Sequence, residues 1–401
     1  MNNLLNARIR KAKLSSTVHL AQIAREYSAA GRKVINLAEG EPDFDTPRHI
    51  VEEAFQAAIA GATRYTSVGG TKELRNAIAE KFLRDNGLDY EMDQIMAGCG
   101  AKQLIFNAMY CTLSSGDEVI VPAPFWVSYP DIVELCGGRA VIAPCEASTG
   151  FKLMPRQLRE ALTPRTKWLI LNSPNNPTGA VYSQDELHAL AEVLSENADV
   201  FILCDDIYEH IVYEPDSFSA LAAVEPNLKE RTLTVNGVSK AYAMTGWRIG
   251  FAAGPTNLIA AMSKLQGQST TSPCSVSQAA AVAALQGKQD NLGEWREIYL
   301  SRRNQTVQAI NSINGLTTKP PQGGFYLFVD CKGLLGRQTP SGEKLEDDNA
   351  VVKFFLESAE VVLVPGTDFG LPDYFRLCFA QQLEVLATAT TRISKACELL
   401  S

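Results

Sequence analysis

Short apolar runs alternate with longer segments of helical spacing along most of the chain. The apolar runs occupy residues 118–121, 140–143, 168–171, 200–203, 232–235 and 249–253. Segments with helical periodicity separate several of them, including 101–112, 184–195 and 255–266. Runs that are apolar at nearly every position are typical of strands buried on both faces, so this alternation predicts a mostly parallel sheet covered by helices. The fold class is therefore α/β.

The pattern changes after about residue 290. We expect a long charged helix over 292–313, strands near 325–329, 361–364 and 375–379, and then a closing helix. This mixture predicts a smaller α+β domain, and the helix expected at 18–30 should pack with it. The predicted organisation is a large domain over residues 48–290, and a small domain made of 1–47 and 291–401.

The composition indicates a globular protein that acts on small molecules. Hydrophobic residues make up 46% of the chain and charged residues 20%, which excludes a disordered chain. The net charge of -8 gives no positive field for nucleic acid or an anionic membrane surface. The uncharged stretch 265–287 is rich in Gln, Ser and Thr, and residues 1–14 lack the apolar segment of a signal peptide. We therefore expect a cytoplasmic protein with no nucleic-acid or membrane partner.

Cysteine and histidine spacing predicts neither a disulfide framework nor a metal site. The nine cysteines are scattered and odd in number, and none forms a Cys-x-x-Cys pair, so they are interpreted as reduced thiols. The four histidines, at 19, 49, 188 and 210, form no ligand cluster in the sequence.

Chemically distinctive side chains follow several of the predicted strands. Ligands of open parallel sheets bind beyond the carboxyl ends of the strands, because loops and helix amino termini converge there. Residues just after the apolar runs are therefore the candidates for a site: Trp126, Asn176, Asp205, Tyr208 and Lys240.

Lys240 and Arg248 together point to a particular ligand chemistry. A lysine that is held still and partly desolvated can attack an aldehyde, and a fixed guanidinium can grip a phosphate. An aldehyde and a phosphate on one small molecule indicate pyridoxal 5'-phosphate. The alternative is that both residues are ordinary surface charges on a loop.

The other candidates suit the ring of the same cofactor. A buried Asp205 would keep a pyridine nitrogen protonated, although a carboxylate at a strand end can also cap a turn. Tyr208 and Asn176 are suited to bind the ring's phenolic oxygen, although Asn176 also belongs to a turn sequence. Trp126 offers a face for stacking, or it is a core tryptophan.

A glycine-containing segment at 98–102 opens a predicted helix. The amides of Gly100, Ala101 and Lys102 could cradle a phosphate at the positive end of the helix dipole. The segment lacks the third glycine of a dinucleotide fingerprint, which argues against a nicotinamide dehydrogenase.

These residues lie within a longer set of motifs that is similar to a known family. The chain resembles class I aminotransferases of the aspartate aminotransferase family, which are fold-type I pyridoxal-phosphate transferases. The resemblance runs nearly end to end, through GEPDFDTP at 40–47, RY at 64–65, GAKQ at 100–103, PFW at 124–126, NPTG at 176–179, DDIY at 205–208, SKAYAMTGWRIG at 239–250, GGFY at 323–326 and FRL at 375–377.

The resemblance implies a role for each matching residue. Lys240 would hold the cofactor and move the substrate proton, and Arg248 would bind the phosphate. Tyr65 would reach that phosphate from the neighbouring subunit of a homodimer. Arg376 and the backbone of Gly40 would bind the substrate carboxylate, beside Trp126 and Asn176.

Departures from the family pattern bear on the choice of substrate. No arginine lies between Arg248 and Arg296, where one branch of the family has the residue that binds a distal carboxylate. Lys102 and Lys13 match lysines of a bacterial branch that includes prephenate aminotransferases, and either could instead be solvated. Gly237 replaces a family serine, so a phosphate hydroxyl would come from Ser239 or be missing.

The resemblance implies transamination between an L-amino acid, expected to be L-aspartate, and 2-oxoglutarate. The alternatives within the family chemistry are an aromatic amino acid or prephenate aminotransferase, and a β- or γ-lyase that uses the same cofactor. An aminotransferase-like effector domain of a transcription regulator is not expected, because only 39 residues precede Gly40 and the chain is acidic.

Overall fold

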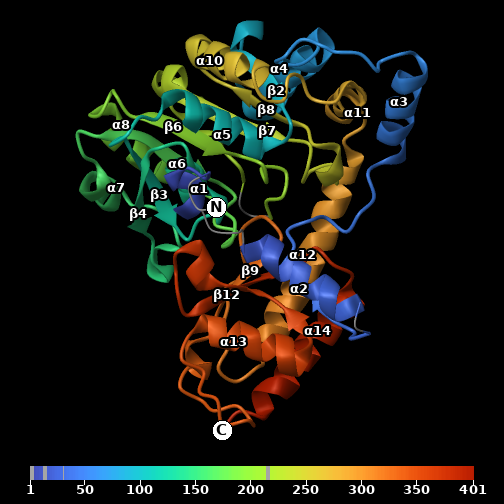
Figure 1. Cartoon of the computed structure of the whole chain (residues 1–401), viewed down its shortest axis with the longest axis vertical. Coiled ribbons are helices and arrows are strands. Elements are labelled where there is room, and N and C mark those ends of the chain that lie inside the picture. The colour runs from blue at the N-terminus through green and yellow to red at the C-terminus, as the bar shows by residue number, and fades with distance from the viewer. Residues whose placement is uncertain (1–3, 12–15, 30, 214–216) are drawn as a thin grey trace.

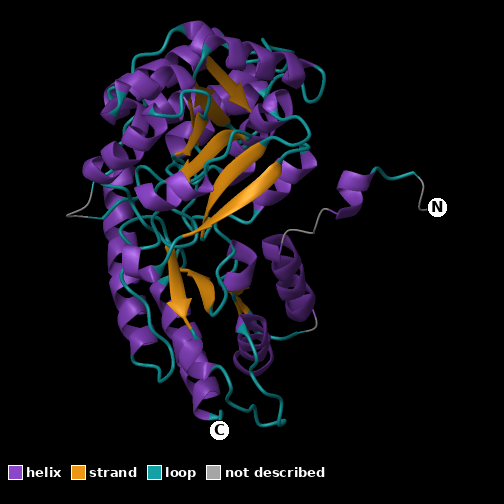
Figure 2. Ribbon diagram, turned by 90° about the vertical axis from the view of Figure 1, so that its left-hand side faces the viewer, coloured by secondary structure: helices purple, strands orange, loops and turns teal. Residues whose placement is uncertain are grey.

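Two lobes make up the structure, a computed structural model that describes residues 4–11, 16–29, 31–213 and 217–401. A long helix, α12 (Asp290–Asn311), runs from the upper lobe into the lower one (Figure 1). The upper lobe contains the large sheet, and the carboxyl terminus lies at the far tip of the lower lobe (Figures 1 and 2).

The large sheet has seven strands, and it is mostly parallel as the sequence predicts. β8 is the exception, because it pairs antiparallel with both of its neighbours. Across the sheet the strands are β2 (Ile95–Gly98), β8 (Gly250–Ala253), β7 (Thr232–Gly237), β6 (Phe201–Asp205), β5 (Thr166–Asn172), β3 (Glu118–Ala123) and β4 (Arg139–Pro144).

Helices cover both faces of this sheet, which explains why its strands are apolar at almost every position. Val119 and Val121 pack in one buried cluster while Ile120, between them, packs in another. The first face is covered by α5 (Ala101–Thr112), α6 (Ser128–Leu135) and α10 (Thr256–Gly267), and the second by α7 (Pro155–Ala161), α8 (Gln184–Ser195) and α9 (Leu221–Val224). At the β2 edge lie α3 (Arg48–Ile59), α4 (Lys72–Asn86) and α11 (Ser275–Gln286).

The uncharged stretch 265–287 is divided between the end of α10 and α11, with a loop between them. In the ranges that the structure describes, no helix has both the length and the apolar character needed to span a bilayer.

The small lobe contains two short sheets. In the three-stranded antiparallel sheet, β12 (Tyr374–Cys378) lies between β11 (Val364–Pro365) and β9 (Tyr326–Asp330). A parallel pair consists of β1 (Ile35–Asn36) and β10 (Val361–Val362). The single strand predicted at 361–364 is therefore wrong, because the chain changes sheets at Leu363. The helices of this lobe are α2 (Ser16–Ala29), α13 (Asp348–Phe354) and α14 (Leu383–Glu398).

The amino-terminal segment contacts both lobes. Helix α2 packs on β1, β10 and β11 of the small lobe, as predicted for this helix. Helix α1 (Ala7–Lys11) instead lies against α6 of the large lobe, where Arg8 donates a hydrogen bond to the Leu135 carbonyl at 3.2 Å. The grouping of residues 1–47 with the small domain, and the boundaries of both domains, stay a prediction.

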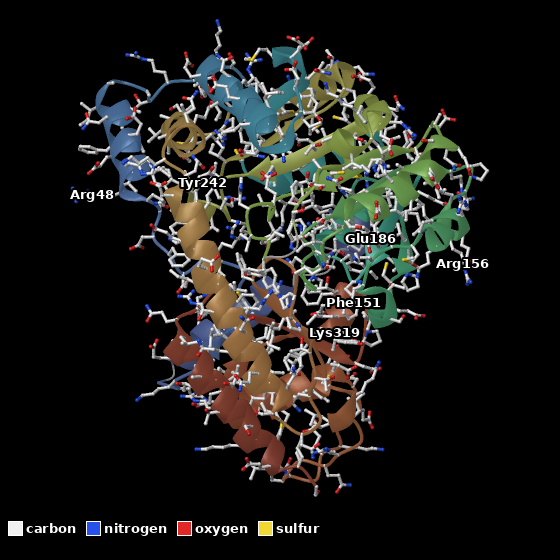
Figure 3. All side chains as sticks on the ribbon, turned by 180° about the vertical axis from the view of Figure 1, so that it is seen from behind. Arg48, Phe151, Arg156, Glu186, Tyr242 and Lys319 are labelled. Carbon is white, nitrogen blue, oxygen red and sulfur yellow. The ribbon has the colours of Figure 1, made fainter. Side chains whose placement is uncertain are left out.

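Contacts between the lobes lie beside the strand ends. Phe151 of the large lobe lies at the boundary with the small lobe (Figure 3). Its ring packs edge-on against Phe328 and Tyr374, with centroids 5.7 Å from each. The backbone N–H of Gly323, which precedes β9, donates a hydrogen bond to the carbonyl oxygen of Gly179 in the large lobe at 2.8 Å. These contacts hold the small lobe over the edge of the sheet where β5, β6 and β7 end.

Candidate active site

A pocket of about 240 Å³ opens between the lobes at the carboxyl ends of β5, β6 and β7. The fold brings eleven of the sequence-predicted residues into its lining: Gly40, Ala101, Lys102, Trp126, Asn176, Asp205, Tyr208, Ser239, Lys240, Arg248 and Arg376. Gly100 lies directly behind Arg248, whereas Tyr65 is 93% exposed and does not line this pocket. Lys13 lies outside the described residues.

Lys240 follows β7 and has the properties of a nucleophilic amine. Its Nζ donates a hydrogen bond to the carbonyl oxygen of Gly40 at 2.5 Å. Burial lowers the pKa of Lys240 to about 8, and the nearby charges of Arg376 and Arg248 act in the same direction. An appreciable fraction of the amine is therefore neutral near physiological pH, which is the form that attacks carbonyl carbons and accepts protons.

Asp205 is the last residue of β6 and a buried carboxyl group. Tyr129 donates a hydrogen bond from its hydroxyl to Asp205 Oδ2 at 2.7 Å. Burial raises the pKa of Asp205 to about 6, although the hydrogen bond from Tyr129 and the charge of Lys240 oppose this shift. The ionised form of Asp205 therefore lowers the stability of the unliganded protein, and it is suited to pair with a protonated group of a ligand.

We predict that Asp205→Asn stabilises the protein when it is freed of small molecules. The folded-state pKa of about 6 lies above the ordinary value of 3.8, so the unfolded chain ionises first and stability falls as pH rises from about 4 to about 6. Above pH 6 the ionised Asp205 lowers the free energy of unfolding by its full amount, on the order of 3 kcal/mol. Asparagine avoids it and keeps an oxygen that accepts from Tyr129.

Urea unfolding at pH 5 and pH 7.5 measures this effect. Asp205→Asn should raise the unfolding free energy at pH 7.5 by roughly 1–3 kcal/mol, and by less at pH 5. Asp199→Asn, at an exposed position, is the matched control and should change it little. A destabilised Asp205→Asn protein at pH 7.5 would contradict the prediction.

Arg376, in the middle of β12, is a buried cation that faces the pocket. Its Nη1 donates to Asn176 Oδ1 at 2.9 Å, and its Nη2 donates to the carbonyl oxygen of Ala38. The guanidinium lies over the rings of Tyr326, at 4.5 Å, and Phe369, at 5.0 Å. Within the described part of the chain its Nε has no hydrogen-bond partner and no carboxylate pairs with it. Such a guanidinium is suited to bind a ligand carboxylate.

The start of α5 and Arg248 form a compact site for an anion. Gly100 is the N-cap of α5, with φ of 88°, and a side chain there would overlap the Arg248 guanidinium. A side chain at Gly250 would overlap the backbone of Ala101 in the same way. The two glycines therefore let Arg248 and β8 approach the helix amino terminus, and Ser239 lines the pocket beside them.

Trp126 and Lys102 form the outer side of the pocket. The Lys102 ammonium lies 4.7 Å from the centre of the Trp126 ring, and Trp126 is half-buried with one edge against Tyr129. The aromatic face and the cation are therefore presented to the same space as Arg376.

Three residues that the sequence analysis left without a role belong to this site. Tyr129 bonds Asp205, and Tyr326 bonds the Tyr208 hydroxyl at 2.8 Å. Asn172 donates to the backbone carbonyl of Asp205 at 2.8 Å and accepts from the backbone of Asn176 at 2.9 Å. Sequence offered weak signals: Tyr129 lies three residues after Trp126, and Tyr326 ends the GGFY motif.

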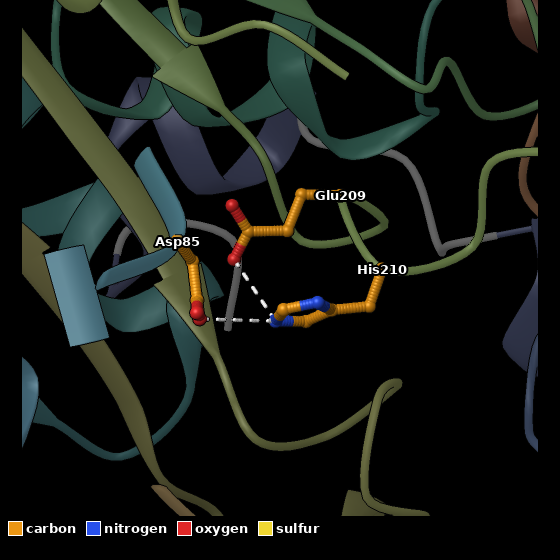
Figure 4. A group of neighbouring side chains, drawn as sticks. All are labelled: Asp85, Glu209 and His210. Atoms are coloured by element: carbon orange, nitrogen blue, oxygen red, sulfur yellow. Dashed lines mark ion pairs between the residues drawn. The ribbon is translucent and has the colours of Figure 1, made fainter. Parts of the chain in front are cut away.

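A charged network centred on the buried residues Lys81 and Glu209 lies next to Tyr208. Glu209 bonds Lys81 of α4, accepts from Asn236 of β7 at 2.8 Å, and lies 3.3 Å from His210. Asp85 is 3.7 Å from the same His210 nitrogen (Figure 4). The spacing of the histidines in the sequence did not predict this cluster, in which His210 lies beside the carboxylates of Asp85 and Glu209. Because Lys81 already neutralises Glu209, we interpret the network as a structural contact that holds α4, β7 and the loop after β6 together.

Comparisons with known proteins extend the likeness over both lobes. Residues 32–393 match the family described as aminotransferase class I and II. The chain is 50% identical over 395 residues to an aspartate aminotransferase of Rhizobium meliloti, covering 98% of this chain and 96% of that one. It is 50% identical over 397 residues to an aspartate/prephenate aminotransferase of Cereibacter sphaeroides, with 99% of each covered. The crystal structure of the aspartate aminotransferase from Rhizobium meliloti has a TM-score of 0.96, with 49% identity and 99% of each chain covered.

Proposed function

The chain belongs to the class I and II aminotransferases, which use pyridoxal phosphate, and on that premise we propose that it transfers the amino group of L-aspartate to 2-oxoglutarate. The membership expected from the sequence motifs is confirmed. Relatives at 50% identity are named for aspartate, one of them also for prephenate. The observation that carries the proposal is a pocket in which Lys240 lies with Arg248, at the expected phosphate site, and with two further cations, Arg376 and Lys102.

The pocket fits the cofactor on three counts. Asp205 is a buried carboxylate suited to a protonated ring nitrogen, the glycine cradle beside Arg248 suits a phosphate, and Lys240 lies in the same pocket as an amine for the aldehyde. When bound, pyridoxal phosphate supplies an aldehyde for the amino group and a ring that withdraws electrons from the substrate Cα.

Each pocket residue has a proposed role in holding the cofactor. Lys240 would bind the aldehyde carbon, and Asp205, which accepts a hydrogen bond from Tyr129, would pair with the ring nitrogen. The remaining residues divide by the part that they hold: Gly100, Ala101, Lys102, Ser239 and Arg248 at the phosphate, Asn176 and Tyr208 at the phenolic oxygen, and Trp126 against the ring face.

The substrate steps follow from the positions of Arg376 and Lys240. Arg376, held by Asn176, binds the α-carboxylate and so orients the substrate Cα, with the backbone of Gly40 beside it. The substrate amino group would displace Lys240 from the aldehyde carbon, and the Lys240 amine set free in this way, beside the Gly40 carbonyl, would accept the proton that leaves Cα. The surrounding buried side chains exclude water and so protect the reacting carbon from hydrolysis.

Lys102 is our proposed contact for the distal carboxylate of aspartate. It lines the same pocket as Arg376, and the arginine-free stretch between Arg248 and Arg296 leaves a dicarboxylate in need of another cation. Lys13 stays a prediction from the sequence.

Lys102→Met should therefore change substrate choice. We expect KM for aspartate to rise about 10- to 100-fold, while KM for tyrosine and alanine changes by less than about threefold, because only aspartate carries a second carboxylate. Half-reactions followed by the cofactor absorbance measure both, and exposed Lys395→Met is the matched control. An equal change for all three amino acids would remove Lys102 from the distal contact.

The same half-reactions separate the rival functions. Aspartate aminotransferase activity requires turnover with aspartate and stoichiometric formation of glutamate from 2-oxoglutarate. Turnover with only aromatic or aliphatic amino acids, or with prephenate alone, would overturn the aspartate assignment. Release of ammonia and pyruvate would indicate a lyase.

We further propose a homodimer in which Tyr65 reaches the phosphate site of the partner subunit. Tyr65 is 93% exposed, and α3 before it also exposes Phe55 and Ile59 to 63% and 65%. Exposed aromatic and aliphatic side chains in one region are typical of surfaces that bind another chain. Full activity from a monomer in sedimentation measurements would contradict this assembly.

The proposed location is the cytoplasm, with small molecules as the other partners. All nine cysteines are unpaired thiols, and six of them are buried, as expected in a reducing compartment. Recovery of the enzyme from a secreted fraction would contradict this location.

A further inference from the structure

Tyr326 contacts both Tyr208 and Arg376, which have different roles in the proposed function. It is the first residue of β9, it is 1% exposed, and it lines the pocket. Its hydroxyl lies 2.8 Å from the Tyr208 hydroxyl, and its ring lies 4.5 Å below the Arg376 guanidinium. A side chain at Gly40 would overlap the Tyr326 hydroxyl, so the glycine makes room for this arrangement.

The direction of the hydrogen bond between the phenols decides what Tyr208 can do. Burial raises the pKa of both hydroxyls, so both carry a proton at physiological pH. One therefore donates to the other. If Tyr208 donates to Tyr326, its only hydrogen is used within the protein. If Tyr326 donates to Tyr208, the Tyr208 hydrogen is free to point into the pocket.

Satisfaction of buried donors favours the second arrangement in the liganded enzyme. Among the described residues, Tyr208 is the hydrogen-bond partner found for the Tyr326 hydroxyl. In the proposed function the phenolic oxygen of the cofactor lies beside Tyr208 and gives it another acceptor, and no ligand oxygen is assigned to the Tyr326 hydroxyl, although Tyr326 also lines the pocket. A buried hydroxyl hydrogen without an acceptor is costly, so only the order from Tyr326 to Tyr208 to ligand satisfies both.

We propose that Tyr326 is a positioning residue, which directs the Tyr208 hydroxyl toward the phenolic oxygen of the cofactor and supports the Arg376 guanidinium with its ring. This inference rests on the proposed roles of Tyr208 and Arg376. The hydroxyl strengthens Tyr208 as a donor, because hydrogen bonds in a chain polarise one another. The ring stabilises a desolvated guanidinium by a cation–π contact.

Tyr326→Phe tests the hydroxyl, because it retains the ring. The readout is the pH midpoint of the visible absorbance of the bound cofactor. A donor to the phenolic oxygen stabilises the deprotonated chromophore, so weakening Tyr208 should raise the midpoint, by about 0.5–1 pH unit. Tyr208→Phe should raise it further, and adding Tyr326→Phe to Tyr208→Phe should change nothing more. The charged and titratable groups that face the two phenols are Arg376, Asp205 and Cys378.

Tyr299→Phe is the matched control. Tyr299 is a buried tyrosine of the same hydrophobic cluster, and its hydroxyl has no partner among the described residues. Its loss should leave the midpoint unchanged. A midpoint unchanged by Tyr326→Phe but raised by Tyr208→Phe would overturn the role of Tyr326 alone. No change with Tyr208→Phe would overturn both roles, and additive shifts would show that Tyr326 does not act through Tyr208.

Tyr326→Leu tests the ring separately. We expect the Kd of succinate, an unreactive dicarboxylate, to rise about 5- to 30-fold, because the guanidinium loses one of its two aromatic contacts and keeps only the one to Phe369. Tyr326→Phe should leave that Kd within about twofold. Equal succinate affinity in wild type and Tyr326→Leu would overturn the support of Arg376, while the pH midpoint of Tyr326→Phe still decides the role of the hydroxyl.

Discussion

Lys240→Ala should lower kcat with aspartate by on the order of 10⁴-fold or more and remove the visible absorbance that depends on a covalent bond to the cofactor. Lys240 supplies the amine that binds the aldehyde, and the same amine accepts the proton from Cα. Burial keeps its pKa at about 8, so alanine removes both a nucleophile and a base that is neutral in part at physiological pH. No other lysine or histidine lines the pocket near Gly40 except Lys102, among the described residues.

Stopped-flow half-reactions and absorbance spectra measure the two effects. Borohydride treatment followed by peptide mass analysis should find the cofactor on residue 240 in the wild type and not in the variant. Lys395→Ala, on the surface of α14, is the matched control for loss of a lysine. Normal turnover by Lys240→Ala, with a native circular dichroism spectrum, would remove Lys240 from the mechanism.

Arg376→Ala should lower kcat/KM for aspartate by roughly 30- to 5000-fold, which corresponds to about 2–5 kcal/mol. The guanidinium is 2% exposed, and within the described residues no carboxylate neutralises it, so the substrate carboxylate is its natural partner. Alanine leaves that carboxylate without a donor and also leaves Asn176 Oδ1 without the hydrogen bond from Nη1. The loss should appear mainly in KM, because the clamp acts before proton transfer.

A second variant tests whether substrate binding needs the two parallel N–H donors of the Arg376 guanidinium. Arg376→Lys retains the charge but cannot bind a carboxylate through two parallel N–H groups, so it should recover only part of the activity. Arg392→Ala, on α14 outside the pocket, is the control and should leave kcat/KM within about twofold. Unchanged kcat/KM in Arg376→Ala would exclude this residue from substrate binding.

Local sequence patterns predicted some elements closely. The helices expected at 101–112 and 184–195 coincide with α5 and α8. In both helices the apolar positions recur at helical spacing, and α5 packs on one face of the sheet and α8 on the other. The long helix shifted by two residues at each end, to Asp290–Asn311. The strand expected at 361–364 was wrong, because two different sheets of the small lobe pair with its two halves.

Part of the candidate site could be predicted because the ends of parallel strands lie together at one edge of a sheet. Residues that follow parallel strands must gather at one edge of the sheet, so the order of the strands along the chain is enough to place Asp205 and Lys240 together. The same rule could have found Asn172, which directly follows the run 168–171, whereas Tyr129 and the His210 cluster had no such rule. Their contacts join segments that are far apart in the chain, and hydrogen-bond partners across such separations leave no periodic signal.

By itself the sequence determined the α/β alternation, the residues at the strand ends and the family motifs, since each of these depends on short-range spacing and residue type. Only the tertiary structure decided the chemical state of the site. The lowered pKa of Lys240 and the raised pKa of Asp205 arise mainly from burial by segments that are distant in the chain. The same packing buries the Arg376 Nε, for which the described residues offer no hydrogen-bond partner. Desolvation and charge proximity are properties of three-dimensional packing, and no one-dimensional pattern specifies them.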